Sequence, residues 1–317
     1  AVIERIQTVG FTILAIVLGS FAWVVAAAWG WHADGWLVTQ WGLHDFGAVG
    51  LVPAVAGFFA LGVLVNLGPR IGKFNADGSA NHIAGHNMPM TVTGLMLIIV
   101  GFWGFLMACV IVPGEGWSWY ENAPATIYGT PITLSALAFN ILMGIAGGII
   151  GAWIYTKDPF WMMSGALAGI ISVASGLDIY FPGLAFIIAF AAGVILQPCA
   201  NILERMGIDD AVGAVTVHGT IGLFGLIMLG VFASGYPALD AFMGDAVPPT
   251  ISLTGQIVGA VVFFLLGFVP GYVVSLILKG LGMLRTPEAA ELAGLDPVKV
   301  PAQGYPEGIP ASAPASN

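Results

Sequence analysis

The sequence predicts an all-α integral membrane protein, an eight-helix transmembrane bundle. Hydrophobic residues make up 58% of its 317 positions, whereas Asp, Glu, Lys and Arg together make up 8%. A soluble domain carries about 25% charged residues, so this chain has too few to cover a water-facing surface. Long apolar runs recur along it, and the cations fall only in alternate connections between them. We therefore expect the lipid bilayer to be the solvent for most of the protein.

Eight segments are long and apolar enough to cross a bilayer, which takes about 20 residues per helix. They are expected near 8–29, 46–67, 89–112, 131–154, 160–176, 182–203, 212–234 and 251–278. The fifth is the weakest, because charged residues bracket it closely. Its sequence, SGALAGIISVASG, is typical of a short helix that packs tightly through small residues, and GIAGGIIG at 144–151 favours the same close approach.

The positions of the cations predict the orientation. All of them fall on one side of these spans: Arg5, Arg70, Lys73, Lys157, Arg205, Lys279, Arg285 and Lys299. The opposite connections carry the aromatic residues of an interfacial belt: Trp31, Trp36, Trp41, Trp117, Trp119, Tyr120 and Tyr236. The positive-inside rule makes the cationic side cytoplasmic. We expect a multi-pass protein of the inner (plasma) membrane with both termini cytoplasmic.

Outside the spans the chain offers little. We expect residues 1–284 to form one transmembrane domain and residues 285–317 a Pro- and Ala-rich cytoplasmic tail. No P-loop, GxGxxG, CxxC pair or metal-spaced histidine cluster occurs, so the sequence favours neither an enzyme nor a cofactor or metal protein. The net charge of −9 lies in loops and the tail, which gives no indication of a nucleic-acid partner.

Polar groups inside lipid are costly and therefore mark candidate functional positions. His218 lies about two turns into the seventh span and is followed by a glycine. It either bonds a neighbouring helix within the core or lines a polar path. Asp45 is expected to cap the start of the second span by accepting from free backbone amides, whether or not it also attracts cations.

Several dispersed motifs resemble those of the Amt/Mep/Rh family of ammonium channels. The Asp45-Phe46-Gly47 run resembles the family's DFAGG, and Gly101 to Phe105 is similar to its GWFGF. Further matches are Glu4-Arg5-Ile6, Gly68-Pro69-Arg70, His86-Asn87-Met88-Pro89, Ile208-Asp209-Asp210 with Val217-His218-Gly219, and Arg285-Thr286-Pro287-Glu288 with Gly294-Leu295-Asp296. They occur in the family's order over nearly the whole chain.

The resemblance implies a homotrimer in which each subunit is an eleven-helix bundle with its own pore. Two inverted five-helix repeats are followed by a final long helix. A site of Trp, Ser and aromatic rings captures ammonium at the outer face through cation–π contacts. Stacked phenylalanines gate the lumen, and two facing histidines line it. On this resemblance Phe105 is the gate residue, with Phe102 and Trp103 beside it, and His218 is one of the two histidines. Without the resemblance, these aromatic residues are as readily core or lipid-facing.

The sequence departs from the family pattern at the pore. Counted from Asp45, the first pore histidine falls at Pro53, which cannot shuttle a proton. The outer-site serine is replaced by Cys109, and Leu106 stands where the family has asparagine. The outer tryptophan corresponds to Trp29 or Trp31. We expect His218 to bond a water or a backbone group in a lumen filled by apolar side chains. The Val49 carbonyl, which loses its helical donor at Pro53, is a candidate partner for a polar neighbour.

The resemblance begins at the end of the family's third membrane helix. The chain is thus an eight-helix relative, a subunit whose three further helices lie on a separate polypeptide, or a truncated form. Two functions remain: an ammonium/ammonia channel, or a non-conducting sensor, scaffold or subunit of a larger membrane complex. The replaced pore residues favour negligible ammonium flux. The RTPE and GLD motifs leave a PII-type signal protein as a possible partner of the tail.

The topology has a direct test. A single cysteine placed within residues 113–130, in a background without Cys109 and Cys199, is expected to react with an impermeant maleimide only from the outer side. Labelling only from the cytoplasmic side would contradict the eight-span topology.

Overall fold

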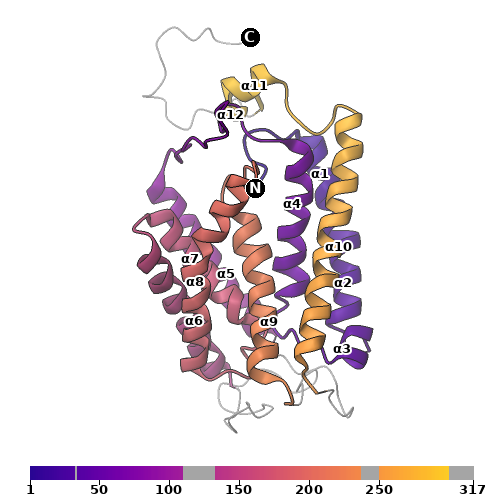
Figure 1. Ribbon diagram of the computed structural model, residues 1–317, viewed down its shortest axis with the longest axis vertical. Coiled ribbons are helices and arrows are strands. Elements are labelled where there is room, and N and C mark those ends of the chain that lie inside the picture. The colour runs from indigo at the N-terminus through magenta and orange to yellow at the C-terminus, as the bar shows by residue number, and fades with distance from the viewer. Residues whose placement is uncertain (33, 110–132, 237–249, 300–317) are drawn as a thin grey trace.

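The computed structural model describes residues 1–32, 34–109, 133–236 and 250–299. Within them the protein is an upright bundle of antiparallel helices (Figure 1). The N-terminus and the short helices α11 and α12 lie at one end, and α3 lies at the other (Figure 1). The aromatic residues predicted at 117–120 fall outside the described residues.

Each predicted span corresponds to a helix or to a run of joined helical turns. The spans are, in order, α1, η1 and α2 (Thr8–Val17, Leu18–Ala22 and Trp23–Gly30), η2 and α4 (Gly50–Ala54 and Val55–Leu67), α5 (Met88–Ala108), α6 (Leu134–Tyr155), α7 (Pro159–Ala174), α8 (Pro182–Arg205), η3 and α9 (Val215–Thr220 and Ile221–Ala233) and α10 (Leu253–Gly280). The short helices are α3 (Trp36–Trp41), α11 (Glu288–Ala293) and α12 (Leu295–Lys299). The segments η1, η2 and η3 are π-helical turns.

Among the described residues, seven of these helical runs are long and apolar enough to cross a membrane, and α7 is the shorter eighth. This agrees with the predicted all-α membrane bundle. The helix α7 is short because it is central. Every residue from Ser164 to Ala174 is buried, and α5, α6, α8, α9 and η3 all pack on it.

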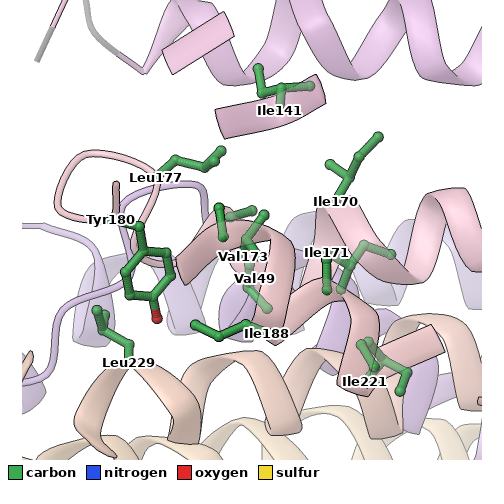
Figure 2. Close-up of a cluster of buried hydrophobic side chains, with 14 of the residues drawn as sticks. Val49, Ile141, Ile170, Ile171, Val173, Leu177, Tyr180, Ile188, Ile221 and Leu229 are labelled. Carbon is green, nitrogen blue, oxygen red and sulfur yellow. The ribbon is translucent and has the colours of Figure 1, made fainter. Parts of the chain in front are cut away.

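The largest core cluster surrounds α7 (Figure 2). Ile170, Ile171 and Val173 contribute from α7, and they meet Val49 and Ile188 from other elements. Glycines allow the neighbouring helices to approach. A Cβ at Gly148 of α6 would collide with the Gly165 carbonyl of α7, as the small residues predicted.

Two helical runs are built to the same plan: η2 with α4, which we call the first half-helix, and η3 with α9, the second half-helix. Asp45 lies before η2 and Asp210 lies before η3, each five residues ahead of its π turn. At the same spacing Asp45 is followed by Pro53 and Gly57, and Asp210 by His218 and Gly222. The first half-helix runs away from the α3 end and the second runs towards it (Figure 1), so the two are related by an inverted internal repeat.

The backbone of the two half-helices shows the same repeat. Ala48 has φ 59° and its counterpart Gly213 has φ 71°. The Val52 amide donates to the Ala48 carbonyl at 2.9 Å, and the Val217 amide to the Gly213 carbonyl at 2.8 Å. A left-handed residue therefore lies at the start of each half-helix, and only the second has the residue type best suited to it.

We predict that Ala48→Gly stabilises the protein by about 0.5–1 kcal/mol, because glycine adopts positive φ without steric cost. The matched variant Gly213→Ala is expected to destabilise by about 1–2 kcal/mol, since its Cβ would also press on the Trp161 ring. Thermal unfolding in detergent measures both changes. A lower melting temperature for Ala48→Gly would contradict this account.

Candidate functional site

Asp45 caps the half-helix that starts at the α3 end. Its Oδ1 accepts from the Val49 amide at 2.8 Å, and its Oδ2 accepts from the Gly50 amide at 2.7 Å and from the Leu51 amide at 3.4 Å. The side chain is buried. Burial raises the pKa of Asp45 to about 6, although these amide hydrogen bonds oppose the shift. The capping interaction predicted from the sequence is present.

Pro53 lies inside η2 and is buried. The expectation that it leaves the Val49 carbonyl available is wrong, because the Ala54 amide donates to that carbonyl at 2.9 Å. In the π turn the donor to the Val49 carbonyl is thus Ala54, the residue after Pro53. Since η3 has the same turn without a proline, the proline occupies a turn that needs no donor at its position.

His218 occupies the matching position of η3, as the fourth residue of the helical run Val215–Ala233, and is half-buried. Among the described residues, no hydrogen bond joins its imidazole to a protein group. Of the two partners expected for it, a water or a backbone group, the backbone group is not found among the described residues. The imidazole remains a side chain with hydrogen-bonding capacity inside an apolar bundle, which is the property expected of a group that contacts a polar solute.

The two half-helices cross close to Pro53 and His218. A Cβ at Gly57 would collide with the backbone of Gly219, and a Cβ at Gly222 would lie 3.3 Å from the Cβ of Ala54. The internal repeat relates Gly57 to Gly222 and Ala54 to Gly219, so it converts one contact into the other. Pro53 directly precedes Ala54, and His218 directly precedes Gly219. Pro53 and His218 therefore occupy equivalent places beside the crossing point.

The other predicted pore residues lie on α5, which packs on α6 and α7. Phe102 and Trp103 are partly buried against the central core, while the Phe105 side chain is 40% exposed. Leu106 is fully buried and packs against Gly47, two residues after Asp45. Cys109, at the position of the outer-site serine, is buried. The described part of the chain thus places an apolar side chain beside the Asp45 cap at the α3 end of the bundle (the outer cap in the predicted topology).

Buried ionic contacts close the opposite end of the bundle. Arg5 is fully buried and donates to the carbonyls of Gly68 and Asp209. Arg70 forms a two-pronged pair with the Asp209 carboxylate at 2.8 and 2.9 Å. Asp210, beside it, accepts from the Val215 amide at 2.6 Å and caps η3. This inner junction joins the chain start, the end of α4 and the start of the second half-helix.

Comparison with known proteins identifies the architecture. The model of the Ammonium Transporter Family matches residues 1–305. The chain belongs to the ammonium transporter family.

Two archaeal relatives show how much of a family member the chain covers. It is 32% identical over 309 residues to the ammonium transporter Amt2 of Methanocaldococcus jannaschii, covering 96% of this chain and 66% of that one. Amt1 of the same organism is 33% identical, with 96% and 72% covered. The chain thus spans about two thirds of the length of these relatives.

Solved structures of the family share its fold. A structure titled "Sensor Amt Protein" superposes with a TM-score of 0.78 at 23% identity, covering 94% of this chain and 71% of that one. Mep2 of Candida albicans superposes with a TM-score of 0.69 at 18% identity, covering 90% and 61%.

Two features of the site in this member of the ammonium transporter family were not predicted from the sequence. The first is a buried pair between His44 Nε2 and Asp178 Oδ2, 2.8 Å apart. The second is the matched spacing from each capping aspartate to Pro53 and His218. A comparison of the DFGAVGLVP run with DAVGAVTVH, which share Val, Gly and Ala in a similar order, would have revealed the second. Nothing in the sequence indicates that His44 and Asp178 meet.

The inner junction gives a pH prediction. Burial opposes ionisation of Asp209, but hydrogen bonds from Arg70 and the charge of Arg5 outweigh it and lower the pKa of that carboxyl. A carboxyl with a lowered pKa stabilises the fold above the unfolded-chain value, about 3.9, and this contribution is lost as the pH falls through the folded value.

We predict that Asp209→Asn costs about 3–5 kcal/mol at neutral pH, because it leaves Arg5 buried without a counter-charge. The variant should also lose less stability than the parent protein when the pH falls below about 4. Unfolding in detergent at several pH values measures this. The control is Asp34→Asn, whose side chain is 93% exposed. Equal stability of Asp209→Asn and the control would contradict the role of the junction.

Proposed function

We propose that this protein provides a pathway for ammonium or ammonia across the membrane, with His218 as its polar contact. The observation that carries the proposal is the His218 imidazole, which lies within a membrane-spanning helical run, half-buried and without a protein hydrogen-bond partner among the described residues. Membership of the ammonium transporter family supports the substrate class. The names of the archaeal relatives, which are ammonium transporters, support it as well.

The physical argument concerns desolvation. A full ammonium cation costs far more to move into an apolar interior than neutral ammonia does. A neutral imidazole has one donor and one acceptor nitrogen, so it can hydrogen-bond ammonia or accept a proton from ammonium. Pro53 lies at the place equivalent to His218 and adds neither capacity. The pathway therefore has one imidazole where the family pattern has two.

A second candidate function follows from the outer cap and the crossing point. Leu106 is fully buried against Gly47, and Cys109 replaces the outer-site serine. These features favour a non-conducting protein that acts as a sensor, a scaffold or a subunit. One structure with the same fold is titled a sensor protein. This likeness concerns the fold, and a sensor function is compatible with it.

Ammonium flux into liposomes separates the two functions. The second function predicts negligible flux from the purified protein, and it predicts that Pro53→His alone does not restore flux while Leu106 and Cys109 remain. His218→Ala tests the imidazole, and His32→Ala is its control, because the His32 side chain is 66% exposed. Robust flux that His218→Ala abolishes and His32→Ala preserves would establish the conducting pathway. Negligible flux with saturable ammonium binding would establish the second function.

The protein is an integral membrane protein, and its assembly belongs to the same proposal. We propose a plasma-membrane location with both termini cytoplasmic, supported by the one-sided cations. We propose a homotrimer, or a trimer-like place in a larger complex, supported by family membership and by helix surfaces rich in small residues. A separate chain that supplies three further helices and a PII-type protein at the tail remain candidate partners.

A further inference from the structure

Comparable buried ion pairs lie at the starts of the two half-helices. At the inner end, Asp209 directly precedes the capping Asp210 and pairs with Arg5 and Arg70. At the outer end, His44 directly precedes the capping Asp45 and pairs with Asp178 at 2.8 Å. The His44 and Asp178 side chains are only 4% and 3% exposed.

The outer pair joins segments that are far apart in the sequence. His44 lies at the start of the first half-helix, whereas Asp178 follows α7. Beside the pair, the Phe46 amide donates to the Ser175 carbonyl at 3.1 Å, and the Gly47 amide donates to the Ala174 carbonyl at 2.9 Å. The ion pair and these two bonds hold the segment 44–47, and hence Asp45, against the end of α7.

The charge on His44 matters because Asp178 has little other support. Its Oδ1 is buried and has no hydrogen-bond partner in the described chain. A buried carboxylate without a counter-charge is strongly unfavourable. An arginine keeps its proton throughout the physiological range, so the inner pairs do not lose their cation. Histidine is the side chain that gains and loses its proton near neutral pH.

We propose that His44 and Asp178 form a proton-dependent clasp at the outer mouth of the protein. With the imidazole protonated, the clasp is closed and holds the segment 44–47 against the end of α7. When the imidazole loses its proton, Asp178 is left as an uncompensated buried anion and the clasp loosens. The closed form binds one proton more than the open form, so closure is favoured at low pH and weakens as the pH rises.

Other titratable groups near the clasp behave differently. Asp45, on the same segment, has its pKa raised by burial to about 6, so it is ionised above neutral pH. Tyr180, on the segment of Asp178, has its pKa raised by burial and by the Asp178 charge, so its hydroxyl stays neutral. Asn140 of α6 bonds the Leu177 and Tyr180 carbonyls and carries no charge. Helix α9 brings no charged residue among its described positions.

Hydrogen–deuterium exchange of the whole 317-residue chain in detergent tests the clasp between pH 7 and 9. The readout is exchange of the Phe46 and Gly47 amides, divided at each pH by exchange of an α8 peptide in the same sample. This ratio removes the intrinsic pH dependence of exchange. For the parent protein we expect the ratio to rise by up to about tenfold per pH unit, the limit for one linked proton.

Variants assign the dependence to the pair. His44→Arg supplies a cation that does not titrate, so its ratio should be low and independent of pH. His44→Gln and Asp178→Asn should also be independent of pH, and the double variant should be better protected than His44→Gln alone. A flat profile for the parent protein overturns the proposal, whether or not the variants fold. A parent-like slope in His44→Arg or His44→Gln overturns it as well.

Discussion

The structure depends on how two helices begin inside an apolar bundle. A helix start exposes free backbone amides, and no water is present in lipid to bind them. Asp45, which is buried, and Asp210, which is half-buried, supply the acceptors for η2 and η3. Carboxylates removed from water in turn require neighbouring positive groups or donors. Beside each cap lies a buried ion pair: Arg5 and Arg70 pair with Asp209, directly before Asp210, and His44, directly before Asp45, pairs with Asp178.

The inverted repeat explains why Pro53 is accommodated and why it is chemically significant. Both half-helices bend through a π turn, in which the position of Pro53 has no donor to lose. The same position in the second half-helix carries His218. The two copies therefore keep a common backbone while differing in the one side chain that could handle a polar solute. The crossing of the two copies is close, because a Cβ at Gly57 would collide with the Gly219 backbone.

The two ends of the bundle differ in the kind of cation that they use. The inner junction uses guanidinium groups, which bind carboxylates in a two-pronged geometry and stay charged. The outer junction uses one imidazole against one carboxylate. The inner end thus has a permanent electrostatic contact between segments far apart in the sequence, whereas the outer end depends on a proton. The proposed clasp makes the α3 end of the bundle responsive to pH.

The sequence by itself determined the class of protein, the eight apolar segments and the cap at Asp45. These features are local: they depend on hydrophobic length, on small-residue composition and on an acid ahead of a helix. The family resemblance located Pro53 and His218. Only the tertiary structure decided that the Val49 carbonyl is satisfied, that α7 lies at the centre, and that His44 meets Asp178. Each of these depends on which distant segments pack together. Hydrophobic patterning carries no information about that pairing when the spans are apolar on all sides.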